Sequence, residues 1–518
     1  MRWPTTSDRF KTCASSQLKY FITFCVFALF IPATLAAEPA IWAEIRVVDA
    51  VSGRGVPLVE LETVNGLKFV TDNAGRIAFH EPGLMDREVF FTVRSHGYEV
   101  NKDGFGFAGV RLTPRVGKIS EVKILRRIVA ERLCRLTGEG LYRDSVILGH
   151  KTPLPDPLSP GRVAGQDSVQ ATAYRNQIYW FWGDTLRMNY PLGLFRMAGA
   201  TSPIPDPKSP WSDPGAGVPF DYFVDKPGFA RAMMPLAERP EGVVWIFGVS
   251  VVPDEKGVGK MVGHYSRRKG LDGEMEQGIA VYNDEKNIFE SVRELPLTEK
   301  WRYPKGHPIL HEEDGVKWVL FGSPNPNVRV RAVLKDVLDP TKYEAFTCAP
   351  LKADEVPQWR WQKELPPVDS TIEKQWFKAG KLKSESTRFY PMDATGDARI
   401  VLHSGSVRWN EYRKRWVLIA CQIDGKSSHL GEVWYAESKH PTGPFVKAVK
   451  ILTHDRQTFY NVCHHDFMDR EGGRVIHFEG TYTRDFSGNP ERTSRYNYNQ
   501  ILYRLDLDAK ELRAAFVE

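Results

Sequence analysis

Five times along the chain, a short strand-like run is followed by a polar turn and then by a second run of branched and aromatic residues. The second runs are Gln177–Asp184, Gly242–Gly248, Gly315–Gly322, Arg415–Ala420 and Gly473–Gly480. The shorter runs before them are Gln166–Ala171, Phe229–Pro235, His307–His311, Gly405–Trp409 and Val462–Phe467. Such runs predict paired β-strands, and their recurrence at a long period is typical of a radial architecture. The pattern therefore predicts an all-β fold in which residues 161–518 form a five-bladed β-propeller with a central pocket.

Residues 40–125 have a different pattern, with short alternating strands separated by turn residues such as Asp72–Gly75. This spacing predicts a small β-sandwich. Its phrasing, with Asp49 to Pro57 after a first strand, resembles the transthyretin-like or carboxypeptidase-regulatory-like domains of exported proteins. Residues 126–160 are expected to be a linker, in which 141–148 would enter the propeller as an outer, ring-closing strand.

Residues 1–37 have the pattern of a secretory signal peptide. Basic residues precede the apolar run Phe21–Ile31, and small residues up to Ala37 follow it. The run is short for a membrane span, so cleavage near Ala36 or Ala37 is expected, with an uncleaved anchor as the alternative. The sequence thus predicts an exported protein, in the periplasm, at the cell surface or outside the cell. No later segment is apolar enough to span a membrane.

The composition bears on which kinds of ligand the protein could bind. The 518 residues carry a net charge of +6, and no basic run is long enough to form a nucleic-acid tail. Aromatic residues make up 12% of the chain, which suits a carbohydrate-binding surface as well as packing between blades. The four cysteines after the signal, Cys134, Cys348, Cys421 and Cys463, lack the paired spacing of a zinc site, and we expect buried free thiols.

Several phrases of the predicted propeller resemble those of the five-bladed glycoside hydrolases, the arabinanase- and xylosidase-like clan that includes family 43. The phrases are Gly165–Ser168, Trp182–Thr185, Ser404–Arg408, Gly431–Ser438 and Pro441–Phe445. The resemblance implies a glycosidase that acts on a polysaccharide or oligosaccharide without a cofactor. It also implies that a calcium or other ion could lie on the propeller axis near a histidine; we assign no metal ligands.

Glycoside hydrolysis needs one carboxyl group as an acid and a second as a base or nucleophile. Asp167, in the first inner run, stands where the clan places its base. The clan usually takes its acid from a third-blade glutamate, but here His307 occupies the inner position of that run. The candidate acids are therefore Glu479, which interrupts an apolar strand, Glu276 and Glu432.

Other polar residues in or near the inner runs are candidates for substrate binding. They are Asp184, Arg231, His307, Arg408, His464 and His465. Arginine in the pocket would suit an acidic sugar, because its guanidinium matches carboxylates and sulfates. The alternative is that each arginine pairs with an inner acid and holds blades together.

Two other functions fit the same pattern. A non-catalytic propeller would only capture glycan, and the missing third-blade glutamate favours this alternative. A polysaccharide lyase would use His465 or Tyr460 as the base and an arginine to neutralise a uronate. Two carboxyl groups in one pocket would favour hydrolysis. A His–Tyr–Arg cluster without a second acid would favour the lyase. One lone aspartate beside tryptophan faces would favour binding without catalysis.

Overall fold

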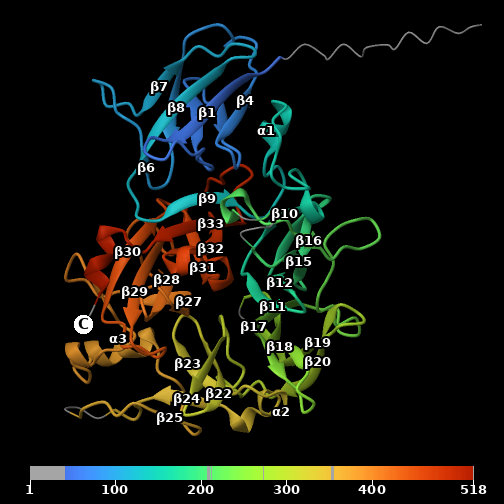
Figure 1. The fold of residues 1–518 in the computed structure, drawn as a ribbon, viewed down its shortest axis with the longest axis vertical. Coiled ribbons are helices and arrows are strands. Elements are labelled where there is room, and N and C mark those ends of the chain that lie inside the picture. Colours follow the sequence, from blue (N-terminus) through green and yellow to red (C-terminus); the bar gives the residue numbers. More distant parts are fainter. Residues whose placement is uncertain (1–40, 207–210, 212, 272, 352–354, 517–518) are drawn as a thin grey trace, which may run out of the picture. The chain divides into compact units, whose positions relative to one another are not determined.

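The computed structural model describes residues 41–206, 211, 213–271, 273–351 and 355–516. The predicted signal peptide lies outside these residues. In the described part the secondary structure is mostly β, as expected (Figure 1). No helix there is long and apolar enough to cross a membrane.

The first region consists of two four-stranded sheets that share one apolar core. Ile45 and Val47 of one sheet pack in the same cluster as Leu61 and Phe91 of the other. The first sheet has the order β4-β1-β8-β6, and the second has the order β3-β2-β5-β7. The strands are β1 Ala43–Asp49, β2 Glu60–Thr63, β3 Lys68–Val70, β4 Arg76–Phe79, β5 Val89–Arg94, β6 Tyr98–Glu99, β7 Gly109–Leu112 and β8 Ile119–Arg126.

Most of the remaining strands of the described chain belong to five further sheets, whose strands are antiparallel except for one parallel edge pair, β26 with β30. The first sheet comprises β11 Gln170–Tyr174, β12 Gln177–Trp182, β15 Ala198–Pro203 and β16 Asp221–Tyr222. The second comprises β17 Val243–Pro253, β18 Gly259–Lys269, β19 Gly273–Asn283 and β20 Ile288–Leu295. The third comprises β21 Ile309–Glu313, β22 Val316–Gly322, β23 Pro326–Arg331, β24 Glu344–Thr347 and β25 Arg360–Gln362.

The fourth sheet, in the order β26-β30-β29-β28-β27, comprises β26 Met392–Asp393, β27 Leu402–Asn410, β28 Arg415–Gln422, β29 Glu432–Ser438 and β30 Lys447–Thr453. The fifth comprises β31 Thr458–His464, β32 Val475–Thr483, β33 Asn499–Asp506 and, from before the first sheet, β9 Glu131–Arg135. A small sheet holds β10 Val163–Gln166, β13 Thr185–Arg187 and β14 Tyr190–Leu194. The α-helices are α1 Arg143–Ile147, α2 Leu334–Val337 and α3 Ser370–Lys378. The 3₁₀ turns are Pro160–Arg162, Pro214–Ala216, Pro340–Lys342, Ser384–Ser386, Asp466–Met468, Glu471–Gly473 and Lys510–Ala515.

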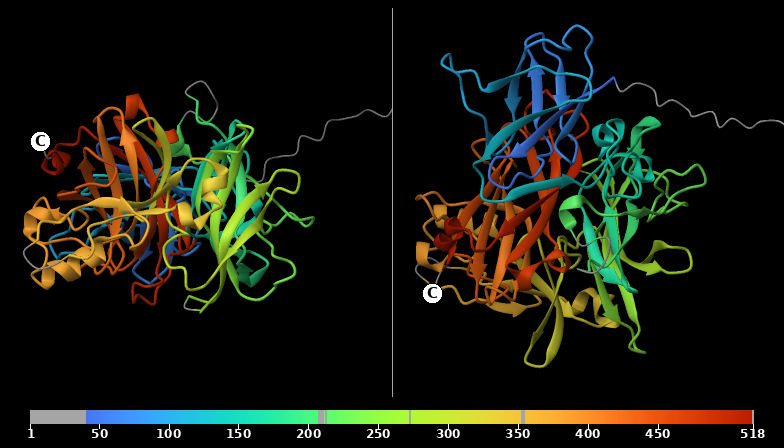
Figure 2. Two further views of the ribbon diagram at one scale, coloured as in Figure 1. Left: turned by 90° about the horizontal axis from the view of Figure 1, so that it is seen from below. Right: turned by 45° about the horizontal axis from the view of Figure 1, so that its top comes forward.

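Successive sheets share apolar clusters, and Figure 2 shows the same sheets from two further directions. The clusters pair Phe181 with Ile246, Val262 with Phe321, Leu320 with Leu418 and Ile419 with Phe459, from the first sheet to the fifth. The fifth sheet in turn packs on the first, because Leu502 and Cys463 share a cluster with Ile178 and Val169. One edge strand of each sheet is β11, β17, β21, β27 or β31, and we call these five the inner strands.

Local turn chemistry explains much of the strand pairing. Between β21 and β22 the two turn residues, Asp314 and Gly315, both have positive φ angles of 51° and 74°. This is the geometry of the tight hairpin turn that Asp-Gly favours, and it places Glu313 opposite Val316. The turn fixes the register, so the apolar residues of β22 face the core.

Two details differ from the sequence prediction. In the second sheet, Val243–Pro253 is the first strand, whereas we had taken 242–248 as the second strand and Phe229–Pro235 as the first. The segment 141–148 contains the short helix α1; the strand that joins the fifth sheet is β9, from the other half of the linker (Figure 1). β9 is buried at every position, so its pairing with β33 covers an edge that would otherwise be open.

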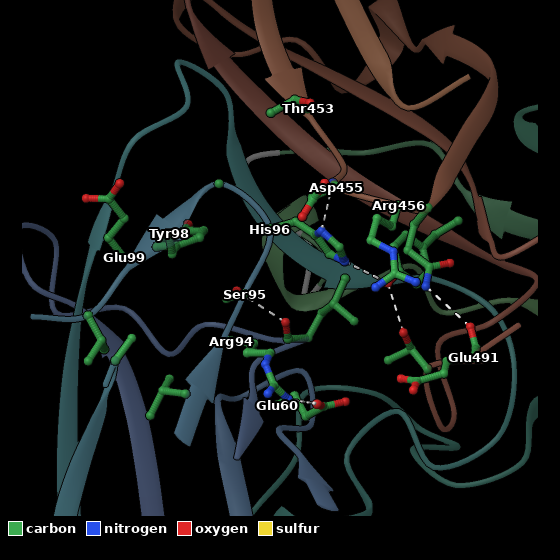
Figure 3. A pocket seen from close by; sticks show the side chains of 18 of the residues that line it. Glu60, Arg94, Ser95, His96, Tyr98, Glu99, Thr453, Asp455, Arg456 and Glu491 are labelled. Carbon is green, nitrogen blue, oxygen red and sulfur yellow. Dashed lines mark hydrogen bonds and ion pairs between the residues drawn. The ribbon is translucent and has the colours of Figure 1, made fainter. Parts of the chain in front are cut away.

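The N-terminal sheets contact the fifth sheet through the apolar cluster that contains Leu58 and through polar groups. Arg132 of β9 is fully buried and donates to the carbonyl oxygens of Pro57 (2.9 Å) and His96 (3.0 Å). The ring of His96 contacts the hydroxyl of Tyr482 at 2.9 Å and accepts from the backbone N–H of Asp455 at 3.1 Å (Figure 3). A cavity of about 840 Å³ with lining residues of both charges lies beside these bonds.

Arg132→Ala should lower the free energy of unfolding by about 3 kcal/mol, because it leaves several buried carbonyl groups without their charged donor. Denaturant titration of the full chain measures this change. Arg127→Ala is the matched control: Arg127 is more than half exposed and pairs with Glu99, so the expected change is below about 0.5 kcal/mol. Equal stability of the two variants would contradict this role for Arg132.

Candidate functional site

A cavity of about 730 Å³ opens where the inner strands begin. Asp167 and Ser168 come just before β11, His307 just before β21, and Tyr460 lies near the start of β31. Residues from all five sheets or their connections therefore meet at one place. Five of its non-glycine residues have positive φ angles: Ser168 (57°), Met197 (58°), Asn461 (51°), Phe486 (65°) and Tyr498 (62°). Such backbone strain is often found at functional sites.

Asp167 is held in this cavity by hydrogen bonds from distant parts of the chain. The hydroxyl of Tyr460 donates to its Oδ2 at 2.6 Å, and the backbone N–H of Asp184 donates to its Oδ1 at 2.9 Å. The close approach of Asp184 depends on Gly183, since a Cβ there would lie 2.5 Å from Oδ1 of Asp167. The side chain thus has one fixed orientation.

Asp184 is the second carboxyl group of the cavity. The indole N–H of Trp245 donates to its Oδ1 at 3.0 Å. Burial and then the neighbouring charge of Asp167 raise its pKa above the ordinary value for aspartate, although the bond from Trp245 opposes this shift. Two coupled, partly buried carboxyl groups are not both ionised easily, so the pair tends to keep one proton.

The surroundings indicate which of the two carries the proton. Burial also raises the pKa of Asp167, but hydrogen bonds from Tyr460, Tyr498 and the backbone of Asp184 favour its charged form. Asp184 receives only the indole bond and faces the charge of Asp167. We therefore take Asp167 as the carboxylate and Asp184 as the carboxylic acid, a division of roles set by environment.

The wall formed by the second and third sheets is aromatic and cationic. Trp245 and Phe247 of β17 line it together with Arg268 and Lys305. The guanidinium of Arg268 lies 5.5 Å from the ring of Trp245, and the ammonium of Lys305 lies 5.1 Å from that of Phe247. Phe486, which is about half exposed, adds a further apolar surface. Aromatic walls with a few polar groups are typical of small-molecule sites.

Of the residues that the sequence proposed, Asp167, Asp184 and His307 come together in this cavity. Arg408, His464 and His465 line a separate cavity of about 610 Å³ at the other ends of the inner strands. Arg231 lies outside the strands. Its guanidinium donates to the carbonyl oxygen of Asn287 and lies over the ring of Phe223.

The three candidate glutamates are buried away from the cavity. Glu276 pairs with Arg239 and Arg267, and Glu432 pairs with Lys450 at 2.7 Å. Glu479 is 1% exposed and contacts Nε2 of His465 at 2.6 Å. Each has a cationic or imidazole partner that accounts for its burial.

Sequence reasoning did not pick out Trp245, Lys305, Asp485 or Tyr498 as site residues. Asp485 and Tyr498 lie in the irregular connection between β32 and β33, where no periodicity marks an inward-facing position. The sequence pattern predicted Trp245 on a second strand, whereas it lies on β17, the inner strand of the second sheet. Tyr460 appeared only as the base of the lyase alternative.

The histidines expected near an axial ion each turn toward a carboxylate instead. Nε2 of His464 lies 2.9 Å from Asp469, and His465 contacts Glu479. Within the described ranges, no three His, Cys, Asp or Glu side chains are grouped so that they could hold a metal ion. These residues therefore do not fit the ion that the resemblance implied.

The four cysteines of the described chain are free and buried.

Comparison with known proteins gives low-scoring structural neighbours and no sequence match. No family model matches the chain, and no curated protein matches it. An α-L-arabinanase from Penicillium chrysogenum, solved with arabinobiose, is 10% identical with a TM-score of 0.35, over 74% of this chain and 99% of that one. An exo-1,5-α-L-arabinanase from a bovine ruminal metagenomic library is 11% identical (TM-score 0.34; 67% and 94%). A GH43_1 enzyme from Xanthomonas citri, solved with xylotriose, is 12% identical (TM-score 0.31; 66% and 87%).

Tyr460→Phe should raise the pKa of Asp167 by about 1 to 2 units. A hydrogen bond to a charged group contributes about 1.5 to 3 kcal/mol, and 1.36 kcal/mol corresponds to one unit. A carbon-13 NMR titration of the carboxyl groups measures the shift. Tyr412→Phe serves as the control, because that hydroxyl bonds Asp508 at the exposed surface and should leave Asp167 unchanged. A lower or unaltered Asp167 pKa in the Tyr460 variant would contradict the assignment.

Proposed function

We propose that the five sheets are the blades of a five-bladed β-propeller. The proposal is supported by the packing of each sheet on the next and of the fifth on the first. In it, β9 closes the ring by adding the outer strand of the last blade. The inner strands would then surround an axis, with the cavity of Asp167 and Asp184 at one end.

We propose further that this cavity hydrolyses glycosidic bonds of a polysaccharide or oligosaccharide. Asp184 gives its proton to the leaving oxygen as the bond to the anomeric carbon breaks. Asp167 takes a proton from the attacking water, whose oxygen forms the new bond to that carbon. These are the roles of an inverting mechanism, the outcome that the sequence resemblance implies.

One observation carries this proposal. Two carboxyl groups share one cavity, and their surroundings favour opposite protonation states. An acid and a base that coexist at one pH are what general acid–base hydrolysis requires. Asp184 takes the role of the acid because Glu276, Glu432 and Glu479 lie outside the cavity and are held by other partners.

The same observations weigh against the two alternatives. A binding-only cavity needs no second carboxyl group beside Asp167. In a lyase, Tyr460 would have to lose its proton, but burial and then the charge of Asp167 raise the pKa of that hydroxyl far above its ordinary value. His465 lines the other cavity, so it cannot reach a substrate beside Asp167.

The remaining part of the proposal concerns location. We propose that the protein is exported, as the pattern of residues 1–37 predicts. The N-terminal sandwich, for which we propose the transthyretin-like type, would serve as a spacer or adhesion unit fixed to the last blade through Arg132.

Asp167→Asn and Asp184→Asn should each lower kcat by about 10²- to 10⁴-fold, the usual size of a general acid or base contribution. Release of reducing ends from a panel of neutral, uronic and sulfated polysaccharides measures the activity. Asp221→Asn is the control, because Asp221 is exposed on β16 and lines none of the cavities described above. Full activity of either cavity variant, with its fold intact, would contradict the proposal.

The pH dependence of kcat/KM should be bell-shaped. Activity rises as Asp167 loses its proton and falls as Asp184 loses its own. Because the pKa of Asp184 is raised, the falling limb should lie above the usual range of aspartate. Asp184→Asn should remove that limb from the residual activity, since no proton remains to be lost there. An unaltered alkaline limb in this variant would assign the acid to another group.

A further inference from the structure

Lys305 places a cation on the wall of the central cavity, where the charges of Glu274 and Arg268 act on it. Its ammonium lies 5.1 Å from the ring of Phe247 and 5.7 Å from that of Tyr303. Among the described residues it forms no ion pair with a carboxylate and no hydrogen bond. By contrast, many of the other lysines and arginines described above pair with an acid or a carbonyl group.

The ammonium of Lys305 is open to the solvent that fills the cavity. Desolvation by its surroundings lowers the pKa of Lys305, the charge of Glu274 opposes this shift, and the charge of Arg268 adds to it. The two aromatic faces compensate only in part, since a cation–π contact contributes about 0.5 to 2 kcal/mol. An anionic group beside the ammonium would stabilise it further, and the cavity provides the space for one.

Arg268 extends the positive wall toward the proposed acid. Its guanidinium is tethered to Glu274 at 3.3 Å and lies over the ring of Trp245. The indole of Trp245 reaches Asp184 on its other side. The cationic wall and the proposed acid therefore share one side chain, and both line the same cavity.

The lining also contains carboxyl groups. Asp167 and Asp485 come from the connections of the first and fifth sheets, while Lys305 and Arg268 come from the third and second. The cavity thus contains both carboxyl and cationic groups, contributed by different elements. A neutral sugar would use only the carboxyl groups. A sugar that carries a negative group would use both, with its linkage at the aspartates and its charge at the lysine.

We propose that the substrate carries an anionic group, a carboxylate or a sulfate, on the sugar bound in this cavity, and that Lys305 is its principal receptor. The inference rests on the proposed glycosidase function and specifies its substrate class. Lysine acts as a point charge and does not require a planar partner, so both anions fit. The arginines that the sequence suggested for this role, Arg231 and Arg408, lie outside the cavity.

Binding can be measured without turnover in an Asp184→Asn background. Asn replaces a carboxylic acid by a neutral group of the same shape, so the charge of the cavity is kept. Calorimetry should compare uronate oligosaccharides, the same oligosaccharides with their carboxyl groups reduced to alcohols, and sulfated oligosaccharides. We expect an anionic ligand to bind at least about tenfold more tightly than the reduced one, and added salt to diminish the difference.

Lys305→Met in this background should abolish the preference, and Lys305→Arg should restore most of it. Lys300→Met is the matched control, because Lys300 belongs to the same connection, is exposed and bonds the carbonyl of Leu297. Equal affinity for charged and reduced ligands, or a loss in Lys305→Met that affects both equally, would overturn the inference. The stronger of the carboxylate and sulfate ligands identifies the anion.

Turnover by the unaltered protein separates this inference from the function on which it rests. Charge-dependent binding through Lys305, together with no release of reducing ends from the bound polymer, would refute the hydrolase and keep the anion site. Hydrolysis of a neutral polymer that Lys305→Met leaves unchanged would keep the hydrolase and refute the anion site.

Discussion

The hydrogen bond from Tyr460 to Asp167 is the interaction on which the site depends. It joins residues 293 positions apart, one before the first of the five sheets and the other in the inner strand of the last. It can form only if the fifth sheet packs on the first, which the shared core of Leu502, Cys463, Val169 and Ile178 achieves. The apolar packing thus comes first, and the orientation of the carboxylate follows from it.

The same bond makes the two aspartates different. A hydroxyl that donates to Asp167 stabilises its negative charge, and that charge raises the pKa of Asp184. Gly183 allows the backbone of Asp184 to approach, so the two residues are coupled through the main chain as well as through space. The opposite wall, with Lys305 and Arg268 over aromatic rings, gives the cavity a second electrostatic feature.

Much of the architecture could be predicted from the sequence because strand pairs leave strong local signals. The runs of branched and aromatic residues in β12, β22, β28 and β32 marked four second strands. The second repeat was out of phase because β17 is eleven residues long, and its apolar first half resembles a second strand. α1 was taken for a strand because its apolar residues span barely one turn.

The site was predicted less completely, for a physical reason. Asp167, Asp184 and His307 lie at strand ends, where periodicity places them. Tyr498, Asp485 and Lys305 lie on connections, whose approach to the cavity is decided by tertiary packing. Glu479 looked exceptional in an apolar strand, yet the side chain that accounts for its burial is His465, fourteen positions away. Sequence shows that a buried charge needs a partner, but not which partner it finds.

The central claim is that Asp167 is ionised while its neighbour Asp184 keeps a proton. Neutron diffraction from crystals exchanged into heavy water near neutral pH would observe this directly. The account predicts deuterium on the carboxyl group of Asp184 and none on that of Asp167. Deuterium on Asp167, or none on either group, would contradict it.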